Sequence, residues 1–197
     1  MINYNLILPE IFNSLSIMFL LIFGVFKKNS SKIVYNLSSI SLIIGLGLLL
    51  VFSYTYDYYL FLDSYKIDNL SFFMKLLTIL SGIFVLLISY KYIEKIKIIK
   101  IEYPILILSA ILGMLVMISS NDLMVFYMGL ELQSLPLYVL AAINTNNVKS
   151  SEAGLKYFVL SALSSGLLLY GCSLIYGFSG STNFDVISSN IGSEEFG

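Results

Sequence analysis

The feature that most constrains this chain is a long apolar stretch with a single acid near its middle. Residues 121–142, NDLMVFYMGLELQSLPLYVLAA, have about the length that a helix needs to cross the ~30 Å hydrocarbon core of a bilayer. At ~1.5 Å of rise per residue, Glu131 lies roughly 13 Å below the polar residues Asn121 and Asp122. A carboxylate at that depth is costly and usually faces a partner or water instead of lipid. Glu131 is therefore the leading candidate for a functional residue.

The composition places the rest of the chain in a membrane as well. Hydrophobic residues make up 58% of the 197 residues and charged residues 12%, whereas soluble domains carry about 25% charged residues. Open strands cannot satisfy their backbone groups in lipid, so the sequence predicts an all-α, polytopic bundle of about six transmembrane helices. The expected spans are residues 7–26, 37–52, 70–90, 103–119, 121–142 and 153–176.

These spans divide the chain into three parts. Residues 1–100 hold three leading spans, residues 101–177 hold the next three, and residues 178–197 form a polar, turn-rich tail. The length leaves no room for a separate soluble domain. A net charge of -1 also argues against nucleic acid as a partner.

Lysines lie in alternate connections between the spans and predict an orientation. The loops after the first, third and fifth spans are basic, with Lys27, Lys28 and Lys32, then Lys91, Lys95, Lys97 and Lys100, then Lys149. The other connections and the tail are acidic, with Asp57, Asp63, Asp68 and Asp122 against the one lysine Lys66. Under the positive-inside rule both termini lie outside, and the basic loops face the cytoplasm or the matrix.

The sequence has no evident site for a redox cofactor or a metal. It contains no histidine and one cysteine, Cys172, so the usual zinc and haem ligand sets are excluded. Cys172 lies in an apolar run and is expected to be a small buried residue. No P-loop or dinucleotide-binding motif is present. All eleven basic residues are lysine, a bias that suggests an AT-rich genome such as many organelles have.

Three more charged residues lie within or at the ends of the predicted spans. Lys75 is about a turn and a half inside the third span, Glu152 caps the start of the sixth, and Lys156 is one turn deeper. For both lysines the alternatives are a functional charge and snorkelling, in which the long stem lets the amine reach the interface. A glutamate at mid-depth cannot snorkel far. For Glu131 the alternatives are therefore a proton or cation relay and a structural hydrogen bond between helices.

A proline follows this acid closely. Pro136 has no N–H to donate to the carbonyl of Leu132, so the helix is expected to weaken one residue after Glu131, where Ser134 can offer its hydroxyl. A kink beside a buried acid is a common setting for ion sites in transporters. In the sixth span, small residues favour close helix packing over chemistry, namely Ser161, Ser164, Ser165, Gly166 and Gly171.

Two long blocks carry a family resemblance. They are GLELQSLPLYVLAA at residues 129–142 and SSEAGLKYFVLSALSSGLLLYGCSLIYGFSGSTNF at residues 150–184, and the match continues upstream to residue 102. LPEIF at residues 8–12 and DNLSFFMKLL at residues 68–77 agree more loosely. In this order and spacing, the chain resembles subunit N of respiratory NADH:quinone oxidoreductase, called NADH dehydrogenase subunit 2 in mitochondria.

The resemblance implies an antiporter-like, proton-translocating subunit in the membrane arm of complex I, with no catalytic activity alone. The family's fifth-span acid, which matches Glu131, is charge-paired with a lysine of the seventh span. NADH, FMN, iron–sulfur clusters and ubiquinone are expected in other subunits, and the partners are other membrane-arm subunits and lipids. The implied location is the mitochondrial inner membrane with both termini in the intermembrane space, or alternatively a bacterial inner membrane with periplasmic termini.

The main difference from the family is that this sequence ends earlier. Family members continue through two broken helices and the lysines of later spans. The expectation is that a second polypeptide supplies the missing helices, as a split gene would, with the break in an exposed loop. The alternatives are a structural remnant without its own proton path and a subunit of a multi-subunit cation/proton antiporter.

Overall fold

The computed structural model describes residues 4–26, 31–51, 58–96 and 100–192, and most of them are helical. After a short 3-10 helix, η1 (Tyr4–Ile7), come seven α-helices: α1 (Leu8–Phe26), α2 (Ser31–Val51), α3 (Asn69–Ile96), α4 (Glu102–Ile118), α5 (Leu123–Ala141), α6 (Val148–Ser179) and α7 (Phe184–Gly192). Five of them are long and apolar enough to span a membrane, and α4 is a shorter apolar helix of 17 residues. The predicted all-α transmembrane bundle is confirmed, with a helix at each of the six expected spans.

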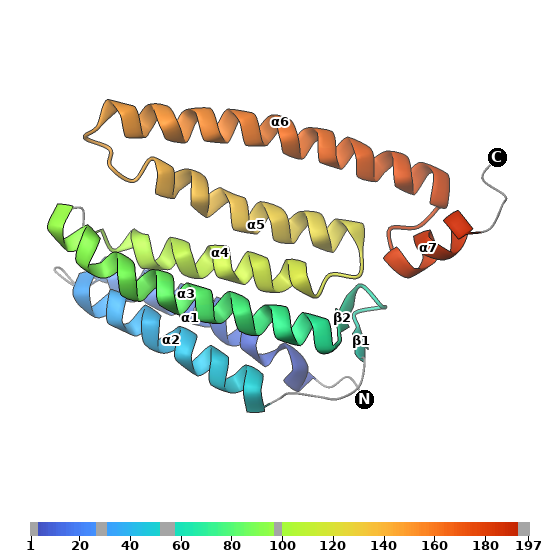
Figure 1. Cartoon of the computed structure of the whole chain (residues 1–197), viewed down its shortest axis with the longest axis horizontal. Helices are drawn as coiled ribbons and strands as arrows, with labels where there is room; N and C mark the ends of the chain where they lie inside the picture. The colour runs from blue at the N-terminus through green and yellow to red at the C-terminus, as the bar shows by residue number, and fades with distance from the viewer. Residues whose placement is uncertain (1–3, 27–30, 52–57, 97–99, 193–197) are drawn as a thin grey trace.

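The long helices run side by side, and α4 lies at the centre of the bundle (Figure 1). Helix α4 packs against α1, α2 and α3 on one side and against α5 on the other, while α6 lies at the outer edge against α5. The core is made of aliphatic side chains from α1 to α4, among them Leu20, Val34, Leu42, Ile79, Leu86, Leu108 and Leu115. In α6, by contrast, the buried residue is Gly154. One whole face of α6 is therefore open to lipid or to other helices.

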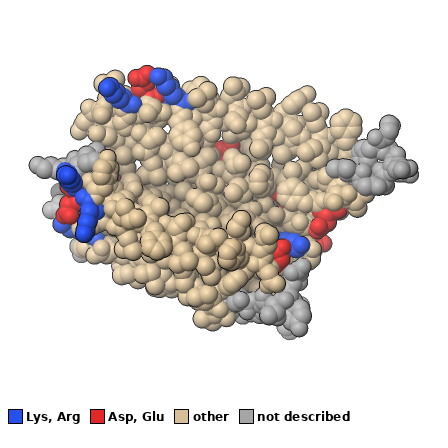
Figure 2. All heavy atoms as spheres, viewed as in Figure 1, with Lys and Arg blue, Asp and Glu red and all other residues tan. Residues whose placement is uncertain are grey.

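Charged side chains lie at the two ends of the long axis, and the broad middle is almost uncharged (Figure 2). The chain direction places Lys32, Lys91 and Lys149 near one end. Asp68 and Asp122, which come just before α3 and α5, lie near the other. This separation fits the lysine-based topology, although Lys27, Lys28, Lys97 and Asp57 lie outside the described residues. The start of α1 and helix α7 lie at the same end of the bundle (Figure 1).

A small β-hairpin, which the sequence analysis did not predict, sits at this acidic end. Strands β1 (Tyr58–Leu60) and β2 (Tyr65–Ile67) pair antiparallel, joined by a turn in which Phe61, Leu62 and Asp63 all have positive φ, from 53° to 64°. The hairpin is attached to the α4–α5 connection, because the amide of Lys66 donates to the carbonyl of Ser119 at 2.8 Å. It therefore links the first three helices to the start of α5.

The region expected to be a turn-rich tail contains a helix. Helix α6 extends to Ser179 and ends where Gly180 adopts the left-handed conformation, with φ of 68°. The side chain of Asn183 then accepts hydrogen bonds from the amides of Asp185 (2.9 Å) and Val186 (3.3 Å), which caps the start of α7. One apolar residue of α7, Ile187, is buried. A cap followed by an anchoring apolar side chain explains why this polar segment is helical.

The start of α6 also differs from the prediction. The helix begins at Val148 and not at residue 153, because Asn147 is the N-cap and accepts from the amide of Lys149 at 3.0 Å. Glu152 therefore lies one turn inside the helix and does not cap it.

Candidate functional site

Helix α5 carries the mid-membrane acid, and its start is fixed by a side-chain cap. The carboxylate of Asp122 accepts hydrogen bonds from the amides of Met124 (2.8 Å) and Val125 (3.4 Å). It also accepts from the Thr182 hydroxyl at 2.5 Å, which ties the α6–α7 connection to α5. Glu131 is nine residues further on, roughly 13 Å along the helix. The cap therefore sets the depth of this acid.

Close packing against α4 sets the rotation of α5. A Cβ on Gly129 would lie 2.8 Å from the backbone nitrogen of Met117, and a Cβ on Gly113 would lie 2.4 Å from the backbone nitrogen of Gln133. These two glycines let the α4 and α5 backbones touch, as small residues do between membrane helices. Because Gly129 is two residues before Glu131, this contact also determines which way the carboxylate points.

Glu131 is partly buried, and its Oε1 is a buried atom without a hydrogen-bond partner among the described residues. Tyr127, one turn earlier on α5, lies close enough to interact electrostatically with Glu131 and with Cys172 of α6. An apolar hollow of about 360 Å³ lies between the same two helices and is lined by Met124, Leu169 and Cys172, among others. Oε1 of Glu131 thus has no hydrogen bond among the described residues, although the Tyr127 side chain lies near the carboxylate.

Pro136 lies inside α5 without ending it, since the helix continues to Ala141. The hydroxyl of Ser134 donates to the backbone carbonyl of Glu131 at 3.2 Å. The hydroxyl that the sequence suggested beside the acid is therefore in place, but it bonds to the backbone and not to the carboxylate.

Glu152 and Lys156 form an ion pair of 2.5 Å on the surface of α6, with side chains 56% and 67% exposed. Both belong to the first turns of α6, near the lysine-bearing end of the bundle. The structure does not bring them to Glu131. Their exposure fits the snorkelling interpretation of Lys156.

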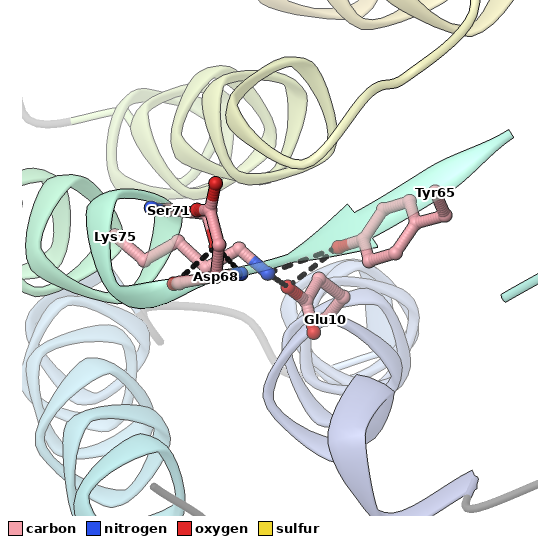
Figure 3. Close-up of polar contacts among 5 residues, drawn as sticks. All are labelled: Glu10, Tyr65, Asp68, Ser71 and Lys75. Carbon is pink, nitrogen blue, oxygen red and sulfur yellow. Dashed lines mark hydrogen bonds and ion pairs between the residues drawn. The ribbon is translucent and has the colours of Figure 1, made fainter. Parts of the chain in front are cut away.

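Lys75 is different, because its amine is buried in an ion pair. The Lys75 side chain is 5% exposed, and its Nζ lies 2.5 Å from Oε1 of Glu10. Glu10 is in the first turn of α1, and its side chain is 6% exposed. The hydroxyl of Tyr65 in β2 donates to the same oxygen at 2.9 Å and accepts from Lys75 at 3.1 Å. Figure 3 shows the three side chains converging from α1, β2 and α3.

The Tyr65 hydroxyl remains a hydrogen-bond donor in this cluster. Burial raises its pKa well above the ordinary value for tyrosine, and the negative charge of Glu10 raises this pKa further. Asp68 and Ser71 position the lysine, since the Asp68 carboxylate accepts from the Ser71 amide (2.7 Å) and the Ser71 hydroxyl accepts from the Asp68 amide (2.9 Å). This reciprocal cap fixes the start of α3 about a turn and a half before Lys75.

Glu10 and Tyr65 were not predicted as site residues from the sequence. A usable signal for Glu10 existed: it is the third residue of α1, Lys75 is the seventh residue of α3, and both helices start at the acidic end of the bundle. Opposite charges at similar depth in parallel spans are candidates for pairing. Tyr65 gave no such signal, because its position depends on the hairpin.

Comparisons with known proteins place these features in context. Residues 120–196 match the family described as NADH:quinone oxidoreductase/Mrp antiporter, TM. NADH-quinone oxidoreductase subunit N of Pelagibacter ubique is 68% identical over 197 residues, which is 99% of this chain and 41% of that protein. Subunit N of Bartonella bacilliformis is 50% identical over 93% of this chain and 38% of its own length. The chain thus spans about two fifths of the length of the curated relatives it matches.

Two solved structures share the fold. Respiratory complex I from Thermus thermophilus with bound aureothin contains a chain that matches with a TM-score of 0.75 and 27% identity, over 89% of this chain and 38% of that one. The membrane-bound sulfane sulfur reductase, an archaeal respiratory membrane complex, matches with a TM-score of 0.78 and 20% identity, over 92% of this chain and 39% of that one. The second likeness concerns the fold alone.

Proposed function

Because this chain belongs to the NADH-quinone oxidoreductase subunit N family, we propose that it forms part of an antiporter-like, proton-translocating unit in the membrane arm of complex I. The observation that carries the proposal is the 68% identity to a bacterial subunit N across 99% of the chain. In this role the chain carries no electrons. NADH, FMN, iron–sulfur clusters and ubiquinone are handled by other subunits of the complex.

In this proposal the Glu131 carboxylate interacts with a positive charge inside the membrane as part of the proton-translocating unit. Its depth in α5 and its unpartnered Oε1 support this role, since an ionised group at mid-membrane needs a cation or water. The partner is a lysine on further transmembrane helices that cover α5 and the exposed face of α6. Those helices belong either to a continuation of this polypeptide or to a separate one, and the two cases are distinguished by identifying every chain that touches α6 in the isolated assembly.

The proposed location is a bacterial inner membrane, because the relatives described above are bacterial. The mitochondrial inner membrane suggested by the composition is the alternative. In either membrane the lysine-bearing end faces the cytoplasm or matrix under the positive-inside rule. Attaching a membrane-impermeant label to a single cysteine introduced beside Lys149 would test this sidedness.

The decisive experiment replaces Glu131 by Gln in the assembled complex. We expect NADH:quinone reduction to be retained in part while protons translocated per quinone reduced fall, because the mid-membrane charge is lost. Glu152→Gln is the matched control, since that carboxylate is exposed on α6 and should leave the ratio unchanged. An assembled Glu131→Gln complex that pumps normally would refute a required role for this carboxylate.

A multi-subunit cation/proton antiporter is the second candidate, because the matching family description names Mrp antiporters as well. That function requires transport dependent on sodium or potassium and no quinone-reducing partners. A purely structural subunit would tolerate Glu131→Gln without change. Measuring ion dependence and co-isolated subunits in one preparation separates the three.

A further inference from the structure

Three buried polar atoms around the ion pair of α1 and α3 have no hydrogen-bond partner among the described residues. They are Oε2 of Glu10, Nδ2 of Asn13 and Oγ of Ser119, in residues that are 5%, 5% and 0% exposed. The other such atom in the described part of the chain is Oε1 of Glu131. Unpartnered buried groups are therefore concentrated at one place, at the acidic end of the bundle.

Helix spacing relates two of these residues, and the third lies near Tyr65 of the cluster. Glu10 and Asn13 are three residues apart on α1 and therefore share one face of that helix. The hydroxyl of Ser119, at the end of α4, lies near the Tyr65 hydroxyl that donates to Glu10, and its oxygen makes no well-formed hydrogen bond among the described residues. Figure 3 shows the second oxygen of Glu10 pointing away from both Lys75 and Tyr65.

The chemistry of these atoms selects the ligand. The Glu10 oxygen accepts, the Asn13 amide donates, and the Ser119 hydroxyl does both. Each such group left without a partner costs free energy, and the cost is larger for a charged one. A metal cation would be repelled by the ammonium of Lys75, and an anion by the carboxylate of Glu10. Water both donates and accepts hydrogen bonds, so it suits each of these three groups.

We propose that ordered water binds between Glu10, Asn13 and Ser119 and completes the hydrogen bonding of the buried Glu10–Lys75 pair. The site is separate from Glu131 and does not depend on the function proposed above. Its water gives the second oxygen of Glu10 a hydrogen-bond donor.

The test is a cryo-EM map of the native assembly at a resolution that shows ordered water. We expect a density peak within about 2.7–3.2 Å of at least two of the three atoms. A site without a peak, in which the Asn13 amide bonds directly to the free oxygen of Glu10, would overturn the proposal.

Variants make the test specific. Asn13→Leu keeps a similar volume and removes the donor, so the peak beside Glu10 should be lost. Ser16→Ala is the control, because the Ser16 hydroxyl donates to the carbonyl of Asn13 at 2.7 Å and leaves the three atoms untouched. Ser119→Ala removes a single oxygen and is used if Asn13→Leu fails to assemble; its peak should weaken or move. An unchanged peak in either variant overturns the proposal.

A spectroscopic measurement gives an independent answer. In membranes labelled with ¹⁵N-asparagine, water-edited solid-state NMR should show fast magnetisation transfer to the side-chain amide of Asn13, assigned by its loss in Asn13→Leu. A buried amide with no bound water would show slow transfer, and that result contradicts the site.

Discussion

Replacing Lys75 by Met tests whether the buried ion pair holds the first three helices together. The change leaves the carboxylate of Glu10 buried opposite an apolar side chain, with Tyr65 as its remaining donor. Breaking a buried pair by removing one partner costs about 3–5 kcal/mol. At ~1.4 kcal/mol per factor of ten, this lowers the folding equilibrium constant by about two to four orders of magnitude.

The double change Glu10→Gln with Lys75→Met should recover most of this loss, because two neutral side chains of similar volume remove the uncompensated charge. The assay is SDS-driven unfolding of the purified membrane protein, followed by circular dichroism. Lys32→Met is the control: it breaks the exposed pair of Lys32 with Glu94, which solvent screens, so little change is expected.

Two results would refute this reasoning. The first is a Lys75→Met variant no less stable than Lys32→Met, which would mean that the buried pair adds nothing to the bundle. The second is a double variant as unstable as the sum of the two single ones, which would mean that Glu10 and Lys75 act independently.

Two further predictions concern the position of α5. Gly129→Ala should destabilise the protein by about 1–3 kcal/mol, since the new Cβ meets the Met117 backbone. Gly166→Ala is the control and should be tolerated, because nothing lies within 4 Å of that site. SDS unfolding of both variants checks this prediction. Asp122→Ala removes the N-cap of α5 and should lower the free energy of unfolding by about 0.5–2 kcal/mol. Faster hydrogen exchange at the amides of Met124 and Val125 would show the loss of the cap. Unchanged exchange would argue against it.

The six helices α1 to α6 could be predicted because an apolar run of spanning length is stable in a membrane only as a helix. Their ends were harder to predict, because they depend on local capping. The start of α6 is set by Asn147, which lies outside the apolar stretch, and α3 continues to Ile96 through a lysine-bearing segment that looks like a loop. Helix α7 escaped prediction for the same reason, since Asn183 caps a mostly polar sequence.

The hairpin could not be predicted from local pattern. Each of its strands has three residues, and β2 is held by contacts with the distant Ser119 and Ser120 as much as by β1. The Glu10–Lys75 pair joins residues 65 positions apart, so the sequence shows two charges but not their contact. The role of Glu131 stays a prediction, because it depends on helices that would lie against α6.

The two membrane acids differ in where their charge is balanced. Glu10 meets its cation inside the unit formed by α1 to α3, and β2 carries that contact to the start of α5 through Tyr65. Glu131 has no such cation among the described residues, and it lies on the helix next to the exposed α6. The buried charges of Glu10 and Lys75 thus balance each other within the first three helices. In α5 and α6 the Glu131 carboxylate lacks a cation and one face of α6 is exposed. A partner that supplies a cation at the depth of Glu131 would balance this charge and cover this face.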